Sequence, residues 1–196
     1  MSTVHTIGHS THSCEELTHA LKENRIEVLV DIRSTPYSSF SPQFDRELLK
    51  ERLQQSGIKY LFLGAELGGR PGRSDYYDSR GRAVYGRMVS DVEFTAGIDR
   101  LERGMGEFRV AIMCGEEDPT HCHRRLLVSR VLIERGHDIL HIRSNGRIQT
   151  ETQLATDSGI ELIDSQPALF AEMDQDRWRS TASVSHKRAP KDFSKP

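Results

Sequence analysis

The sequence predicts a single α/β domain of three layers, in which helices cover both faces of a mainly parallel sheet. Its 196 residues are about the length of one domain. Short apolar, β-branched runs alternate along the chain with stretches whose apolar residues recur at helical spacing, and this alternation favours right-handed crossovers in an α/β sandwich. The continuous, β-branched segment at residues 28–32 is typical of a strand buried on both faces of a parallel sheet.

The first part of the chain is expected to contain two strands and one helix. Residues 4–7 form a short strand that a turn follows. Ser13 and Glu16 have the spacing of a capping box, which predicts a helix that runs to about Asn24. Residues 28–32 form the second strand and place Asp31 near its carboxyl end.

The middle of the chain predicts two helices around a third strand. Residues 45–56 have helical spacing, end at Gly57 and lead into a strand at residues 60–63. A long loop is expected over residues 64–84. The next helix is predicted to begin at Tyr85 or Met88 and to end at Arg103.

The last part predicts two further strands. Residues 108–113 form the fourth strand, and Cys114 follows directly. Pro119 begins a helix that Gly136 ends, before a fifth strand at residues 138–142. Residues 147–173 are expected to supply a short strand and a final helix against the sheet.

Composition and charge restrict the class of protein. The residues AVILMFWYC make up 36% of the chain and DEKR 29%, and no apolar run approaches the ~20 residues that a membrane span needs. The N-terminus lacks the basic-then-apolar layout of a secretory signal, and three cysteines leave one unpaired in any disulfide scheme. We therefore expect a cytoplasmic protein without membrane contact, whose cysteines are thiols or ligands.

A basic tail is expected after a domain that spans residues 1–173. The formal net charge of the chain is -2, yet residues 177–196 contain six basic residues and one acid. Residues 174–196 have few large apolar side chains, so they cannot bury enough surface to offset the entropy of ordering. We interpret them as a flexible extension, either a solvated tail or an electrostatic arm for a polyanion.

Polar and reactive side chains follow four of the predicted strands at the point where each ends. Ligands of open α/β sheets bind at the carboxyl ends of the strands, so we expect these side chains to gather in one site. They are His9 and Ser10 after the first strand, Asp31 and Arg33 at the second, Arg70 after the third, and Cys114 and Glu116 after the fourth.

The segment of residues 114–125 is the densest in such groups. It passes from a strand into a predicted helix start, where basic residues are unfavourable unless an anion lies nearby. Either the acids at residues 116–118 supply that anion, or Arg124 and Arg125 bind a phosphate or carboxylate together with helix amides.

Several short motifs occur along the chain. In order, they are Thr6-Ile7-Gly8-His9-Ser10, Val30-Asp31-Ile32-Arg33-Ser34 with Pro36, Gln43-Phe44, Leu67-Gly68-Gly69, and Cys114-x-Glu116 followed by His121-Cys122-His123-Arg124-Arg125. Together they resemble the domain of unknown function 488 family over about residues 4–143. The resemblance implies a compact α/β domain with a shared polar site, implies no particular reaction, and does not extend to the basic tail.

Our main hypothesis assigns the chemistry to carboxylates. Asp31 or Glu116 activates water or attacks a sugar carbon, while His9 and His123 transfer protons. The arginines then hold phosphate, and Cys114 mainly shapes the pocket. This interpretation accounts for the largest number of polar residues.

Two alternatives use the cysteines instead. Cys114 could be a nucleophile activated by His9 or His123, although the acidic residues that follow it would repel an anionic group and raise the pKa of its thiol. Otherwise a metal site of Cys114, Cys122 and His121 could bind zinc, with Glu116 as the base for a bound water. No other cofactor is expected.

The ligand is expected to be a nucleotide or a nucleic acid. Arginines interleave with tyrosines in residues 70–87, a composition that suits single-stranded or flipped-out nucleic acid, although a solvated loop with core-facing tyrosines has the same pattern. The expected anion- and substrate-binding residues are Ser10, Arg33, Tyr37, Arg70, Arg124 and Arg125. The predicted function is an enzyme of hydrolase or transferase type; its rivals are a non-catalytic nucleic-acid-binding or regulatory module and a thiol or zinc redox sensor. The sequence predicts no oligomeric state.

Overall fold

A computed structural model describes residues 1–162 and 178–184 of the chain. Within them, one sheet has the strand order β3-β2-β4-β1-β5-β6. The strands β1 to β5 pair in parallel, and β6 is antiparallel to β5. Their bounds are Thr3–Gly8 for β1, Val28–Asp31 for β2, Lys59–Phe62 for β3, Val110–Cys114 for β4, Asp138–Ile142 for β5 and Ile148–Thr150 for β6.

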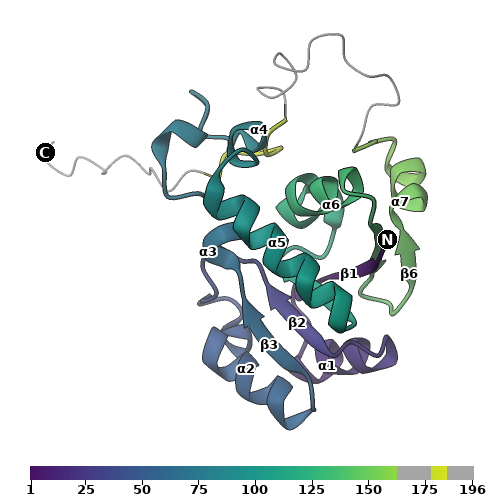
Figure 1. The fold of residues 1–196 in the computed structure, drawn as a ribbon. Helices are drawn as coiled ribbons and strands as arrows, with labels where there is room; N and C mark the ends of the chain where they lie inside the picture. The colour runs from purple at the N-terminus through teal and green to yellow at the C-terminus, as the bar shows by residue number, and fades with distance from the viewer. Residues whose placement is uncertain (163–177, 185–196) are drawn as a thin grey trace, which may run out of the picture.

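Helices cover both faces of this sheet, so the predicted three-layer α/β class is confirmed (Figure 1). The long helices are α1 (Cys14–Glu23) and α2 (Arg46–Gln55) on one face and α5 (Val92–Glu107) on the other, where α6 (Arg130–Glu134) also packs. Shorter elements are α3 (Gly64–Leu67), α4 (Tyr85–Met88), α7 (Glu151–Ser158), the 3-10 turns η1 (Pro42–Phe44), η2 (Ser74–Tyr76) and η3 (Pro119–His121), and the π-helix η4 (Arg124–Ser129). None of the helices described has the length and apolarity that crossing a bilayer requires.

Two apolar clusters hold the layers together. On one face, Leu17 and Leu21 of α1 pack with Leu29 of the sheet. On the other, Ile98 of α5 packs with Ile112 of β4. Since the central strands contribute to both clusters, their side chains are buried on both faces, as the segment at residues 28–32 predicts.

The predicted helix that ends near residue 103 is two helices in the structure. The helix α4 ends at Met88, and α5 begins after Asp91, whose side chain caps it by accepting a hydrogen bond from the Glu93 backbone N–H. An N-cap residue adopts an extended backbone, which is incompatible with a continuous helix. The predicted helix from residue 119 to residue 135 is interrupted in the same way, because Cys122 has an extended backbone between η3 and η4.

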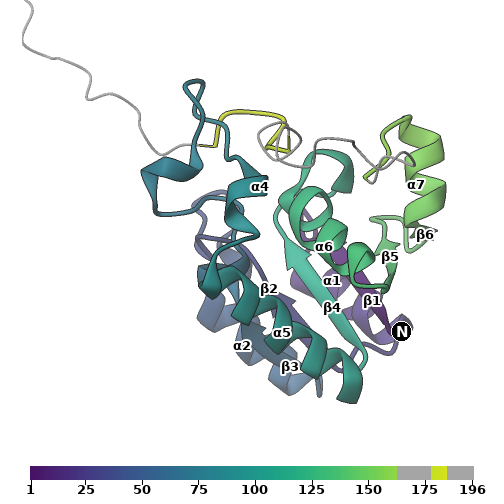
Figure 2. The ribbon, with the colours of Figure 1, turned by 45° about the horizontal axis from the view of Figure 1, so that its top comes forward.

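Part of the expected tail packs against the domain. Residues 178–184 cross beside α4, as the yellow segment in Figure 2 shows. Arg179 forms a β-bridge with Val84, and the Trp178 indole N–H donates to the carbonyl of Leu126. These seven residues therefore correct the expectation that the extension is flexible throughout; residues 174–177 and 185–196 lie outside the described part of the chain.

Acid is expected to destabilise the fold through His5 of β1. Burial, followed by the nearby Arg109 guanidinium, lowers the pKa of His5 from 6.5 to about 4. Below pH 6.5 the unfolded chain therefore takes up a proton that the folded chain binds only near pH 4, so that stability falls as the pH is lowered across this window. We expect the unfolding midpoint temperature to drop less in His5→Gln than in the natural chain. The exposed His19 of α1 supplies the control: a His19→Gln variant that flattened the profile equally would contradict this assignment.

Candidate active site

A cavity of about 660 Å³ lies at the carboxyl edge of the sheet. The loops after β1, β2 and β4 line it, together with residues 180–184 from the C-terminal segment. The predicted site residues that line it are His9, Arg33, Tyr37, Arg70, Cys114, Glu116, His121, Cys122 and His123. The strand ends that were expected to meet at one edge of the sheet thus surround a defined cavity. The other predicted site residues, Ser10, Asp31, Arg124 and Arg125, do not line it.

Backbone hydrogen bonds join the loops that follow β1 and β4. The His9 N–H donates to the Cys114 carbonyl at 3.0 Å, and the Ser10 N–H donates to the Gly115 carbonyl at 2.9 Å. Ladder-like pairing therefore continues beyond the last residue of each strand. This pairing fixes His9 next to the segment that carries Glu116.

Asp31 is enclosed by donors rather than open to a substrate. Its carboxylate accepts from the Arg33 backbone N–H and Nε, from Arg33 Nη2 at 2.6 Å, and from the Tyr60 hydroxyl at 2.7 Å. Burial, followed by the charge of Asp31, raises the pKa of Tyr60, so its phenol stays a donor. In this geometry Asp31 holds Arg33, and its role in acid–base chemistry stays a prediction.

Arg33 and His9 form the next part of the same network. Arg33 Nη1 lies 3.2 Å from His9 Nε2, and Arg33 Nη2 also donates to the Phe44 carbonyl. His9 Nδ1 lies 3.0 Å from the Ser10 carbonyl, so the neutral tautomer donates there and accepts from Arg33. Burial, followed by Arg33, lowers the pKa of His9 to about 4. His9 thus lines the cavity as a neutral imidazole.

Arg124 and Arg125 are both buried and serve the protein's own framework. The guanidinium of Arg124 donates to the carbonyls of Glu116 and Glu117. Arg125 forms an ion pair of 2.6 Å with Glu151 and donates to the Ile160 carbonyl. Internal acceptors thus take Nη1 and Nη2 of Arg124 and Nε and Nη2 of Arg125, whereas Arg124 Nε and Arg125 Nη1 are buried without a partner in the described part of the chain. Neither arginine lines the cavity, and their binding of a ligand anion stays a prediction.

Two thiols and an imidazole meet on the cavity wall. Cys114 Sγ lies 3.5 Å from His123 Nδ1, and Cys122 Sγ lies 3.9 Å from the same nitrogen. The hydrogen bond with Cys122, followed by burial, raises the pKa of Cys114. Burial alone would raise the pKa of Cys122 too, but the hydrogen bond from Cys114 and the charge of Arg124 hold it well below its ordinary value. Of the two thiols, Cys122 is thus the one favoured as a thiolate, while Cys114, the nucleophile of the first alternative hypothesis, is held as a thiol.

The predicted metal set of Cys114, Cys122 and His121 changes by one residue. His121 is exposed, whereas His123 places its nitrogen within 4.8 Å of both sulfurs. The backbone is extended at Cys122, and the ring of His123, rather than that of His121, lies beside both sulfurs. Among the described residues, Cys114, Cys122 and His123 are the group that could hold a metal ion.

Glu116 and Arg70 are the charged side chains that the protein leaves free on this cavity. Both are exposed, and neither side chain hydrogen-bonds or ion-pairs with any residue in the described part of the chain. Arg70 is held through its backbone N–H, which donates to the Ser34 hydroxyl. Tyr37 lines the same cavity with 54% of its surface exposed. A carboxylate, a guanidinium and an aromatic ring are thus available to a ligand.

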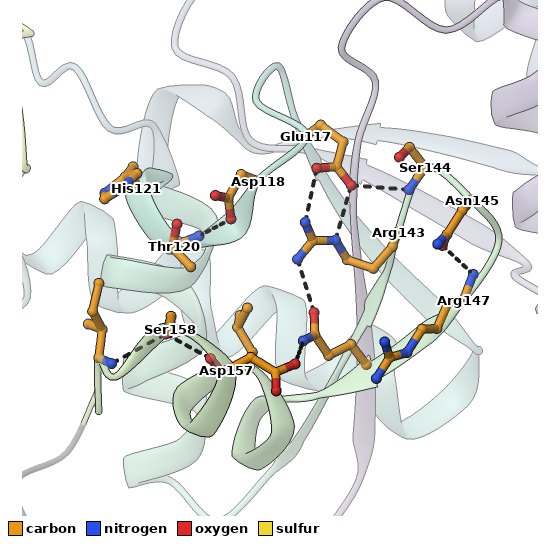
Figure 3. A pocket seen from close by; sticks show the side chains of 13 residues that line it. Glu117, Asp118, Thr120, His121, Arg143, Ser144, Asn145, Arg147, Asp157 and Ser158 are labelled. Carbon is orange, nitrogen blue, oxygen red and sulfur yellow. Dashed lines mark hydrogen bonds and ion pairs between the residues drawn. The ribbon is translucent and has the colours of Figure 1, made fainter.

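A neighbouring cavity of about 530 Å³ behaves differently (Figure 3). Its central cation, Arg143, forms a paired contact of 3.0 Å with Glu117 and donates to Gln149, which in turn donates to Asp157. These polar groups satisfy one another across the space. We therefore assign this network a structural role: it fixes Glu117 and, with Arg124, the course of the loop that carries Glu116.

The basic, tyrosine-rich segment of residues 70–87 is largely committed to contacts within the protein. Arg73 pairs with Asp75 and Asp91, and Arg82 pairs with Asp78. The hydroxyl of Tyr76 donates to Asp91, and Tyr85 is buried. The segment therefore contributes Arg70 and Tyr85 to the cavity rather than an open stacking platform.

Sequence reasoning missed two contributions to this site. Tyr60 caps the Asp31 carboxylate from β3, and residues 180–184 close one side of the cavity. The register of the strands could have placed Tyr60 near Asp31. The strands β2 and β3 are parallel neighbours with Asp31 opposite Phe62. Tyr60 lies two residues before Phe62 and therefore on the same face of the sheet. No local signal marks residues 180–184, because these small and mostly polar residues lie within a basic stretch that has the composition of a solvated tail.

Comparison with known proteins identifies a family. A family model described as "Domain of unknown function DUF488" matches residues 13–131. This range includes Arg33, Arg70 and the segment from Cys114 to Arg125. No curated protein and no solved structure matches the chain.

Proposed function

Because the chain belongs to the domain of unknown function 488 family, whose name assigns no reaction, we propose a function from the cavity itself. The protein is an enzyme of hydrolase or transferase type that acts on a nucleotide unit, either free or within a nucleic acid. Glu116 serves as the base, and Arg70 binds phosphate. His9 lies on the cavity wall as a neutral positioning group.

The observation that carries this proposal is the pair of unpartnered charges on one cavity. Glu116 and Arg70 line it without a hydrogen-bonding or ion-pairing partner among the described residues. A guanidinium binds phosphate oxygens in a planar, two-point geometry, and an exposed carboxylate can accept a proton from water or from a substrate hydroxyl. The exposed ring of Tyr37 suits stacking with a base.

Size and pairing favour one nucleotide unit over a long strand. A volume of about 660 Å³ lies within the range of roughly 300–1,000 Å³ that is typical of small-molecule sites. A groove along a nucleic-acid backbone would need further free cations along the cavity, and the exposed Arg80 does not line it. Arg73 and Arg82 instead ion-pair with aspartates, and Arg33 is enclosed by Asp31.

Turnover of a nucleotide panel tests this proposal. Mononucleotides and short single-stranded DNA and RNA would be incubated with the full chain, and products would be identified by mass spectrometry. Turnover of mononucleotides or of oligonucleotides shows whether the substrate is a free nucleotide or one within a strand. We expect Glu116→Gln to lower kcat by about 10²- to 10⁴-fold, the usual contribution of a general base. Arg70→Gln is expected to weaken binding roughly ten- to a hundredfold, the value of one charge-assisted hydrogen bond.

Two matched variants control for charge alone. Arg80→Gln removes an exposed arginine of the same segment, and Glu107→Gln removes an exposed carboxylate at the end of α5; neither residue lines the cavity, so both should behave like the natural chain. Binding without turnover of any panel member would favour a non-catalytic module. Equal activity in Glu116→Gln and Glu107→Gln would refute the assigned base.

A further inference from the structure

We infer that Cys114, Cys122 and His123 form a zinc site with one coordination position open to the cavity. All three side chains line the same cavity, and their ligand atoms lie within 4.8 Å of one another. Two thiolates and an imidazole are the ligand types that select zinc and other metals of similar softness. Cys114 comes from the end of β4, and the two other ligands come from the turn between η3 and η4.

The interatomic distances are close to those of a tetrahedral zinc site. Zinc–sulfur and zinc–nitrogen bonds of about 2.3 and 2.05 Å at a tetrahedral angle place sulfur and nitrogen roughly 3.6 Å apart. The corresponding distances here are 3.5 Å from Cys114 and 3.9 Å from Cys122 to His123 Nδ1. Shifts of a few tenths of an ångström in the side chains would thus be enough to close the site on a metal ion.

The orientation of His123 is fixed as a metal ligand requires. Its Nε2 lies 2.9 Å from the Ile32 carbonyl, to which it donates, so Nδ1 carries the lone pair that faces both sulfurs. Metal-binding histidines usually donate their second ring N–H to a carbonyl or carboxylate in this way. Gly69 packs on the ring: a Cβ at this position would lie 2.5 Å from His123 Cγ. The glycine therefore allows the backbone to cover the imidazole.

Three protein ligands leave room for a fourth from the cavity. On binding, Zn²⁺ takes both sulfurs as thiolates, and the thiol protons pass to the solvent. Sites with three protein ligands and an open position bind water and lower its pKa to about 7. Glu116 lines the same cavity. Metal binding itself requires no nucleotide, so this inference stands or falls separately from the proposed function.

Metal content and cobalt substitution test the site on the natural chain. The full chain would be purified after growth with zinc, and its metal content measured by mass spectrometry; we expect one zinc per chain. Replacing zinc by Co²⁺ should produce thiolate-to-cobalt charge-transfer bands and the intense visible bands of a tetrahedral site. Alkylation of Cys114 and Cys122 should become faster after zinc is removed by a chelator. The alkylation rate of Cys14, which is not a ligand, should stay the same and serves as the internal reference.

Matched substitutions assign the ligands. Cys114→Ala and His123→Gln should weaken zinc binding by at least about a hundredfold and remove the cobalt bands, while Cys14→Ala and His121→Gln should retain both. Thermal unfolding of each variant shows whether it is folded. Absence of zinc and of cobalt bands in the natural chain would overturn the inference. So would a Cys114–Cys122 disulfide as the resting form, or loss of the bands in His121→Gln.

Discussion

Replacement of Asp31 by asparagine is expected to lower the free energy of unfolding by about 3–5 kcal/mol, the usual cost of breaking a buried ion pair on one side. The carboxylate is fully buried and accepts from Arg33 through both its oxygens and from the Tyr60 hydroxyl. An asparagine offers one acceptor oxygen and turns an NH₂ group toward these donors. The Arg33 guanidinium would then be buried without its counter-charge.

A double-mutant cycle separates this structural role from catalysis. Asp31→Asn, Arg33→Gln and the double variant would be unfolded in urea, and we expect the double variant to lose less stability than the sum of the single losses. Tyr60→Phe removes one donor only and should cost about 1 kcal/mol. If Asp31→Asn retained the natural stability but lost turnover, Asp31 would be a catalytic group after all.

Local signals in the sequence were sufficient for much of the fold. The capping box at Ser13 and Glu16 predicts the start of α1, and both of its hydrogen bonds are present. The apolar run of Val28, Leu29 and Val30 predicts a strand buried on both faces, and all four residues of β2 are buried, Asp31 included. Such features depend on neighbours within a few residues, so one sequence is enough to recognise them.

The partners of the charged residues could not be predicted in the same way. Arg125 pairs with Glu151, and Asp31 binds Tyr60, across 26 and 29 positions of the chain. Sequence reasoning identified these residues as polar and close to strand ends, but not which of them neutralise one another. It therefore proposed a catalytic role for Asp31 and an anion-binding role for Arg124 and Arg125, without the internal partners that the fold gives to all three.

The candidate site is defined by which charged side chains have partners within the protein and which do not. Asp31 forms an ion pair with Arg33, which in turn hydrogen-bonds to His9. The Arg124 guanidinium donates to the carbonyls of Glu116 and Glu117. Each of these contacts fixes groups that form or support the cavity wall. Preorganised walls of this kind reduce the reorganisation that binding and catalysis would otherwise require.

A methyl group at position 8 is expected to disrupt this wall more than any change on the cavity surface. An alanine Cβ at Gly8 would lie 1.8 Å from the Glu116 carbonyl oxygen and 2.8 Å from Glu117 Cα. Both atoms belong to the backbone, so no side-chain rotation relieves the overlap. We expect Gly8→Ala to lose at least about 3 kcal/mol of unfolding free energy, the upper range for overpacking, measured by urea denaturation or, where folding fails, by soluble yield.

Gly104 provides the matched control, because it lies inside α5 and a Cβ there meets no atom within 4 Å. Alanine is the better helix former, so Gly104→Ala should raise the free energy of unfolding by about 0.5–1 kcal/mol. The opposite signs separate a steric clash from a general effect of glycine replacement. If Gly8→Ala instead unfolded within about 0.5 kcal/mol of the natural chain, the range of an ordinary surface substitution, β1 and the loop after Cys114 could not approach as closely as described. Glu116 would then lack the close backbone contact with β1 that places it on the cavity wall.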